Sequence, residues 1–473
     1  MKIVDSAQHK NHLRPNAAAT PEPSKIINVV ELIDSHKMTL YQRTIVFLCF
    51  LVLVADGFDA GAIGYISPSL IGDWHISRGA LGPVMTASLL GLGLGALIAG
   101  PVGDVIGRKT VLVGSVGSFG VFSLIAAHAN SVESLTVLRL LTGIGLGAAM
   151  PNALTLTSEF SPIRVRSICV CAMNAGYGTG LVIGGIVSAS VIPAYGWRMI
   201  LIVGGLAPMT LAVVLMLLLP ESLQFLAMHE KHAHRIKKVV FRISPATGLD
   251  DATFIVSSRI NGPKRRLDNL KLLFAKQHVV GTAMLWVAYF MGLLIYYLLL
   301  NWLPILMSDS GFTHTEASLM TSIFPLGGIV GTVCVGWLMD RKEGTRVIAG
   351  TFGLTAILVA VAGTLTGHHY AIALLLFVCG ALLISAPTAM SALAVGYYPA
   401  QCRVSGVSWM HGIGRLGGVA GAGIGAVLLS TGWNLGAIFG LLAVPAIVAS
   451  GAIYIMAPDK RGRRGLRGPE QIG

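Results

Sequence analysis

Two carboxylates lie three residues apart in a stretch of the chain that is otherwise apolar. Asp56 and Asp59 belong to ADGFDA, which follows TIVFLCFLVLV and precedes GAIGYISPSL, and neither flank carries a charge. At this spacing the two side chains share one face of a helix. Neighbouring carboxylates in an apolar medium do not both ionise easily, because desolvation and mutual repulsion favour the protonated form of at least one. The pair therefore predicts a proton-coupling site, unless one aspartate pairs with an arginine of another helix and only stabilises packing.

Two arginines also lie inside apolar segments, where each charge costs roughly 2.5–3.5 kcal/mol to insert and is therefore expected to have a function. Arg139 opens RLLTGIGLGAAMPN, and three roles are open to it: binding a substrate anion, pairing with an aspartate, or reaching the membrane interface. Arg415 follows His411 by four residues in WMHGIGRLGG, so the two share a helix face. With Trp409 they predict a clamp for a carboxylate attached to a ring, although packing and hydrogen bonding also explain His411.

Aromatic side chains near these charges are suited to form the apolar walls of a binding site for an aromatic ring. Many of them must face lipid or neighbouring helices, so we expect two or three to touch a substrate. The candidates are Phe58, Tyr65, Tyr289, Phe290, Tyr296, Tyr297 and Trp302.

The elements that must position these residues are membrane-spanning helices. The chain is 54% hydrophobic and 12% charged, whereas soluble proteins carry about 25% charged residues. Its apolar blocks are roughly 20 residues long, enough to cross a membrane as helix. The sequence therefore predicts an all-α membrane protein with twelve spans, at 44–66, 80–100, 111–129, 134–156, 168–191, 199–219, 279–300, 317–338, 347–366, 371–395, 404–429 and 435–456.

The net charge of +13 follows the topology of these spans. Lys and Arg concentrate in the two tails, in the even-numbered loops and in the central segment, whereas the opposite side has only Arg78 and Arg198. This asymmetry places both termini in the cytoplasm. It also explains the excess of basic residues. Nucleic-acid binding is not indicated, since no basic stripe is interleaved with aromatic residues. We expect an uncleaved first span, preceded by a short amphipathic helix on the membrane surface in SKIINVVELIDSHKM.

Other motifs predict no metal and no cofactor. The six cysteines show no metal-ligand spacing. The GxGxG run after Arg139 lies inside an apolar span with no preceding strand, unlike a nucleotide-binding loop. The linker motif MHEKHAHR contains His229, His232 and His234, for which a solvated basic helix is a better explanation than a metal site.

The spans form two sets of six, which predicts an internal duplication. The domains are a tail at 1–43, a six-helix bundle at 44–219, a linker at 220–278, a second bundle at 279–456 and a tail at 457–473. GPVGDVIGRK after the second span and GWLMDRKEGTR after the eighth both begin with Gly and place Asp four residues later. Two related halves with a repeated short turn are typical of a rocking transporter.

The first of these turns resembles the signature of the major facilitator superfamily. Gly100, Asp104, Gly107 and Arg108 match it, whereas Val105 stands where the family has Arg. LPESLQFL after the sixth span is a further resemblance. The likeness implies that the loop residues take part in conformational cycling, together with Glu159, Arg164, Asp340 and Arg341.

ADGFDAGAIGYISPSL, RLLTGIGLGAAMPNALTLTSEFSPIRVRS and GVSWMHGIGRLGG resemble one branch, the aromatic acid:proton symporters. The resemblance implies import of 4-hydroxybenzoate, protocatechuate, benzoate or a similar acid across the bacterial inner membrane. It also implies that Asp56 and Asp59 are needed for transport, and that Arg139, Glu159, Asp104 and Arg108 are important for cycling. We expect a monomer in the lipid bilayer, with protons and a small aromatic acid as its partners.

Three other functions compete with this one. The first is a symporter with the same mechanism whose substrate is a non-aromatic organic acid or a sugar acid. A membrane sensor would need a signalling domain, for which the linker is too short. An integral membrane enzyme would need a nucleophile–base set or a metal cluster within the spans, and the sequence shows neither, so we expect no enzyme.

Overall fold

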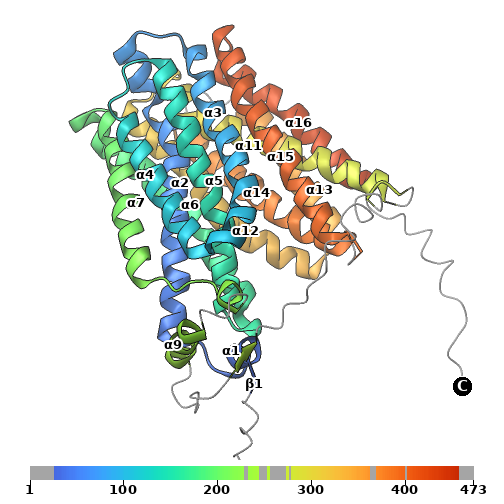
Figure 1. Ribbon diagram of the computed structural model, residues 1–473. Coiled ribbons are helices and arrows are strands. Elements are labelled where there is room, and N and C mark those ends of the chain that lie inside the picture. The colour runs from blue at the N-terminus through green and yellow to red at the C-terminus, as the bar shows by residue number, and fades with distance from the viewer. Residues whose placement is uncertain are drawn as a thin grey trace, which may run out of the picture.

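The computed structural model describes residues 26–227, 233–243, 253–255, 273–275, 278–362, 369–399 and 402–456. Twelve of its helices are long and apolar enough to cross a membrane, which confirms the predicted all-α membrane fold (Figure 1). The first half contains α2 (Leu40–Trp74), α3 (Gly82–Ile106), α4 (Arg108–Ala126), α5 (Val132–Phe160), α6 (Ile163–Tyr195) and α7 (Arg198–Leu218). The second half contains α11 (Val279–Asp309), α12 (His314–Arg341), α13 (Gly344–Ala362), α14 (His369–Tyr397), α15 (Arg403–Ser430) and α16 (Leu435–Met456). Both tails beyond these ranges, much of the linker, His229 and His232 lie outside the described residues.

Several helices continue past the apolar blocks from which they were predicted. The block at 44–66 lies within α2, which has 35 residues and begins at a capping box between Thr39 and Gln42. Hydrophobicity reports the part of a helix that crosses hydrocarbon, whereas caps and interfacial contacts decide where the helix ends.

Glycines allow the helices within each half to approach closely. A Cβ atom at Gly143 or Gly147 of α5 would collide with the backbone of α3, at Ser88 and Leu92 respectively. The Gly-x-x-x-Gly spacing of these two residues predicts this kind of contact. It fixes α5, and with it Arg139, against α3.

A small cap covers one end of the first half. Strand β1 (Ile26–Asn28) pairs in parallel with β2 (Thr253–Ile255), and α1 (Val29–Ser35) follows β1 directly. The amphipathic helix predicted for the membrane surface is thus shorter than expected, and its apolar residues Val29 and Ile33 pack into the core of the first half. Helix α9 (Ala233–Ile243), part of the predicted basic helix, packs its apolar face into the same cluster. We call the end of the molecule that carries α8 (Leu223–Ala227) and α9 the linker side, and the opposite end the far side.

The two halves touch each other on the far side. Arg78, which opens the short helix η1 (Arg78–Leu81), forms an ion pair of 2.6 Å with Asp309 at the end of α11. Thr315 of α12 donates a hydrogen bond of 3.1 Å to the backbone carbonyl of Ala189 in α6. Gly185 of α6 lies so close to α12 that a Cβ atom would collide with Ser322. These contacts close the far side.

Toward the linker side the same helix faces separate. Gly178 of α6 is still within contact distance of Ile329 in α12. Two turns further along α6, Cys171 is exposed, and on α12 the next residue of the contact face, Val333, is exposed as well. The halves therefore diverge from the middle of the helices toward the linker side. We call the region between these exposed faces the linker-side opening.

Candidate functional site

Asp59 forms a buried ion pair with Arg139 inside the first half. The Arg139 guanidinium donates hydrogen bonds of 3.1 and 3.2 Å from Nη1 to the two carboxylate oxygens, and Nη2 donates to the Thr142 hydroxyl at 3.3 Å. The side chains of Arg139 and Asp59 are 0% and 1% exposed. Of the three roles open to Arg139, pairing with an aspartate is the one that the structure contains. Both charges are thereby removed from direct contact with a solute.

Asp56 is as deeply buried as Asp59 but has different neighbours. It is 3% exposed, and its Oδ1 has no hydrogen-bond partner among the described residues. Arg415 and the hydroxyl groups of Tyr177, Tyr296 and Tyr297 lie within electrostatic range of its carboxyl group. Asp56 thus faces polar groups from α6, α11 and α15, so both halves contribute to its surroundings.

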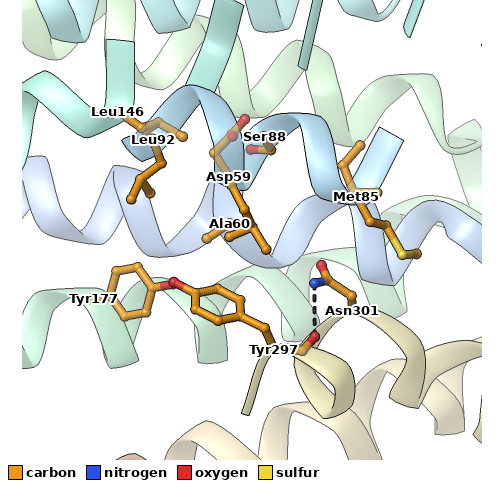
Figure 2. Close-up of a pocket in the computed structure, with 11 residues that line it drawn as sticks. Asp59, Ala60, Met85, Ser88, Leu92, Leu146, Tyr177, Tyr297 and Asn301 are labelled. Carbon is orange, nitrogen blue, oxygen red and sulfur yellow. Dashed lines mark hydrogen bonds between the residues drawn. The ribbon is translucent and has the colours of Figure 1, made fainter. Parts of the chain in front are cut away.

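A small cavity lies beside Asp59. It has a volume of about 20 Å³, and polar side chains from four helices line it: Asp59, Ser88, Tyr177, Tyr297 and Asn301. Figure 2 shows Asp59 directed away from Tyr177 and Tyr297, whose hydroxyl ends point toward each other. Asn301 donates a hydrogen bond of 2.9 Å to the carbonyl of Tyr297, drawn as a dashed line. A space of this size holds about one water molecule, so an aromatic acid does not fit in it in this conformation.

Arg415 is the candidate cation that is accessible between the halves. Its Nη1 donates a hydrogen bond of 3.0 Å across the interface to the Leu92 carbonyl of α3. The residue is partly exposed and forms no ion pair within the described part of the chain. Because a guanidinium carries five N–H donors, Arg415 keeps donors for a carboxylate.

His411 lies one turn from Arg415 on the same face of α15, as predicted from the spacing. Its ring is exposed and stacks on Tyr289 of α11, with centroids 5.1 Å apart and an interplanar angle of 22°. Its Nε2 lies 3.0 Å from the hydroxyl oxygen of Ser391 in α14. Trp409 does not join this group: it stacks on Trp286 at 6.1 Å, and six residues turn it about 120° around the helix from Arg415. The structure thus brings His411, Arg415 and Tyr289 together, whereas Trp409 lies on another side of α15.

Three of the other candidate aromatic residues lie in packing positions. Phe58 is two residues from Asp56, so it points to the other side of α2, where it packs against Gly184 and Gly204 of α6 and α7. Tyr65 is buried and donates a hydrogen bond of 2.9 Å to the Leu181 carbonyl. Tyr296 is buried and packs against Phe324, with ring centroids 6.2 Å apart. In this conformation these side chains are not placed where a solute in the linker-side opening would touch them.

The structure adds polar residues that the sequence did not single out. Ser88, Tyr177 and Asn301 line the small cavity, and Ser391 bonds His411. An uncharged polar side chain in an apolar helix is weak evidence of a functional site, because serine and asparagine commonly form a hydrogen bond to a carbonyl of their own helix. Asn301 and Ser391 both make such a bond.

Four of the predicted cycling residues of the first half, Asp104, Gly107, Arg108 and Glu159, lie together on the linker side. Gly107 has a φ of +96° at the turn between α3 and α4, a conformation that favours glycine. Arg108 lies 3.3 Å from Asp104 and 4.0 Å from Glu159. Glu159 also accepts a hydrogen bond of 2.7 Å from the hydroxyl of Ser222. The network links α3, α4, α5 and the segment after α7.

The segment LPES extends this network. Glu221 accepts a hydrogen bond of 2.9 Å from the backbone N–H of Lys109, and its carboxylate lies against Gly107. A carboxylate at the first turn of α4 interacts favourably with the helix dipole. Gly100 has no atom near the position of a Cβ, so open space surrounds it. Arg164 lies apart from the network and donates a hydrogen bond of 2.6 Å to the His36 carbonyl, which ties α6 to the cap.

The second half lacks an equivalent network among the described residues. Arg341 stacks over the Trp337 ring at 4.1 Å, and Asp340 is exposed and forms no ion pair with a described residue. The repeated turn is therefore similar in sequence and different in its contacts.

Comparison with known proteins places this arrangement in context. A family model described as Major Facilitator Superfamily matches residues 49–341 and 285–471. The chain is 42% identical over 440 residues to a 4-hydroxybenzoate transporter of Pseudomonas aeruginosa, covering 93% of this chain and 98% of that one. It is also 42% identical over 429 residues to a gallate transporter of Pseudomonas putida, covering 90% and 94%. Among solved structures, a D-xylose–proton symporter matches with a TM-score of 0.68 at 16% identity, covering 89% of this chain and 99% of that one. The inward open conformation of the xylose transporter from E. coli matches with a TM-score of 0.67 at 16% identity, covering 89% and 98%.

Proposed function

The chain belongs to the major facilitator superfamily, and from this premise we propose that it is a symporter that imports a small aromatic carboxylate together with protons. The observation that carries the proposal is the 42% identity, over at least nine-tenths of this chain, to transporters named for 4-hydroxybenzoate and gallate. Both named substrates are hydroxylated aromatic acids. We propose transport and no enzymatic activity, because these relatives and the structural neighbours are named as transporters.

Arg415 is the residue that we assign to the substrate carboxylate. Arg139 is fully buried and its charge is already balanced by Asp59, whereas Arg415 is partly exposed at the linker-side opening. Two N–H groups of a guanidinium match the two oxygens of a carboxylate. The ring of His411, which stacks on the buried Tyr289, supplies a flat face beside it, as a ring substrate requires.

Asp56 is the residue that we assign to proton coupling. Asp59 has both oxygens bonded to Arg139, so a proton on Asp59 would break a buried ion pair. Asp56 has a buried oxygen without a partner among the described residues, and Arg415 is the cation within electrostatic range. A substrate carboxylate on Arg415 would draw its charge away from Asp56. Binding of the anion and protonation of Asp56 would therefore favour each other, which is the coupling that symport requires.

The structure supports a cycle in which the halves rock around this site. The far side is closed by contacts such as Arg78–Asp309, while the linker-side faces are apart. We place the linker side and both termini in the cytoplasm, and the protein in the bacterial inner membrane, on the distribution of Lys and Arg. The network of Asp104, Arg108 and Glu159 would then hold the cytoplasmic ends of α3, α4 and α5 together as one body during rocking.

Uptake of radiolabelled acids by cells that express the protein tests the proposed cargo. The panel contains 4-hydroxybenzoate, gallate, benzoate, a non-aromatic organic acid and a sugar acid. We expect saturable uptake of aromatic acids above the level of cells with empty vector. Uptake of the organic acid or the sugar acid without uptake of any aromatic acid would refute the proposal and favour the alternative cargo.

A further inference from the structure

The hydrogen bonds around Ser391 determine which nitrogen of His411 carries a proton. The Ser391 hydroxyl lies 2.8 Å from the carbonyl oxygen of Pro387, and a carbonyl can only accept. The single hydroxyl proton of Ser391 is therefore donated to Pro387. Since Ser391 also lies 3.0 Å from Nε2 of His411, the serine oxygen must accept at that contact, and Nε2 must donate.

A neutral imidazole that donates from Nε2 presents a lone pair at Nδ1. Nδ1 of His411 has no hydrogen-bond partner in the part of the chain that the structure describes. The ring is exposed, and its stacking on Tyr289 at an angle of 22° holds its plane. The linker-side opening thus contains a fixed hydrogen-bond acceptor that none of the described residues uses.

Arg415 lies on the same face, one turn deeper toward the middle of the membrane. A guanidinium only donates and therefore selects the carboxylate of a substrate, whereas a bare nitrogen lone pair selects an O–H group. Side chains four residues apart on a helix have Cβ atoms about 5–6 Å apart, so both groups lie within reach of one small aromatic acid. One helix face therefore presents complementary partners for the two ends of a hydroxylated aromatic acid.

We propose that His411 is a specificity residue that accepts a hydrogen bond at Nδ1 from a ring hydroxyl of the substrate. Ser391 is its positioning residue, because it fixes the tautomer. The proposal rests on the proposed function and narrows it: the preferred substrates are hydroxylated aromatic acids, and benzoate, which has no hydroxyl group, is the poorer ligand. An acid without this group leaves the acceptor at Nδ1 unpaired or bonded to water.

The test compares the affinities of the purified protein for 4-hydroxybenzoate and benzoate. His411→Phe keeps a flat ring beside Tyr289 and removes both nitrogens. We expect it to lower the preference for 4-hydroxybenzoate over benzoate by about 3- to 10-fold, the effect of one neutral hydrogen bond. His411→Asn, whose amide oxygen can replace Nδ1 as an acceptor, should retain part of the preference.

Two serine variants distinguish an effect on the His411 tautomer from a general effect on the packing of α14. Ser391→Ala removes the acceptor for Nε2–H, and we expect it to weaken the preference in the same direction as His411→Phe. Ser385→Ala on the same helix removes a similar bond to a carbonyl of its own helix and should leave the preference unchanged. These variants also provide the test if His411→Phe fails to fold.

Each outcome separates this inference from the proposed function. If the wild-type protein binds neither acid, the proposed function itself fails. If it binds both, and His411→Phe changes the two affinities by the same factor or leaves their ratio unchanged, the role of His411 is refuted while aromatic acid transport stands.

Discussion

Asp59 and Arg139 form an ion pair with a nitrogen–oxygen distance of 3.1 Å, and their side chains are 1% and 0% exposed. Asp56 lies three residues earlier on the same helix and is also buried, yet its Oδ1 has no partner among the described residues. Two carboxylates that look equivalent in the sequence therefore have different surroundings. One neutralises a buried cation within the first half, and the other faces groups from both halves.

The first prediction concerns the effect of each aspartate on the stability of the protein. Asp59→Asn leaves Arg139 buried without a counter-charge and should reduce the free energy of unfolding by about 3–5 kcal/mol. Asp56→Asn removes no ion pair and should have little effect. Thermal unfolding in detergent measures both, and equal midpoints for the two variants would contradict the assignment of Asp59 to a structural ion pair.

The second prediction concerns recognition of the substrate anion. Arg415→Gln removes the accessible guanidinium and should raise the KM for aromatic acid uptake by about 10- to 100-fold, because a charge-assisted hydrogen bond contributes about 1.5–3 kcal/mol. Arg346→Gln is the matched control, since Arg346 is exposed and pairs locally with Glu343. An unchanged KM in Arg415→Gln, at normal amounts of protein in the membrane, would remove Arg415 from the binding site.

The third prediction concerns the glycine between the two aspartates. A Cβ atom at Gly57 would collide with the Tyr177 carbonyl of α6, whereas open space surrounds Gly72 on the same helix. Gly57→Ala should lower the free energy of unfolding by about 1–3 kcal/mol through overpacking, and Gly72→Ala should not. Melting curves in detergent compare them; equal midpoints would show that α2 and α6 do not pack this closely.

The fourth prediction concerns the linker-side network. Glu159→Gln weakens the contacts with Arg108 and Ser222, so we expect a lower maximal rate of uptake with an unchanged substrate affinity. Glu343→Gln changes an exposed carboxylate of the second half and serves as the control. A change in affinity without a change in rate would assign Glu159 to binding rather than to cycling.

The fold could be predicted from the sequence because a membrane imposes a simple length rule. Twelve apolar blocks of roughly 20 residues correspond to twelve helices. The cap was not predicted, because β1 and β2 pair across more than 200 residues. The apolar residues of α1 fit a membrane surface as well as a protein surface, so their pattern alone does not distinguish the two.

The charged residues of the site could be predicted, but their pairing could not. A charge in an apolar span is conspicuous, and this singled out Asp56, Asp59, Arg139 and Arg415. Which aspartate contacts Arg139 depends on how α2 packs against α5, eighty residues away. Phe58 and Trp409 point away from Asp56 and Arg415 for a related reason, since neighbours in the sequence point to different sides of a helix.

Proton movement during substrate uptake tests the central claim most directly. The purified protein is reconstituted into vesicles that contain a pH-sensitive dye, and 4-hydroxybenzoate is added outside with no other driving force. We predict acidification of the interior together with uptake of the acid in wild-type vesicles. In Asp56→Asn vesicles we predict loss of the acidification, with exchange of labelled for unlabelled acid retained. Uptake with no proton movement, or unchanged acidification in Asp56→Asn, would contradict proton-coupled symport through Asp56.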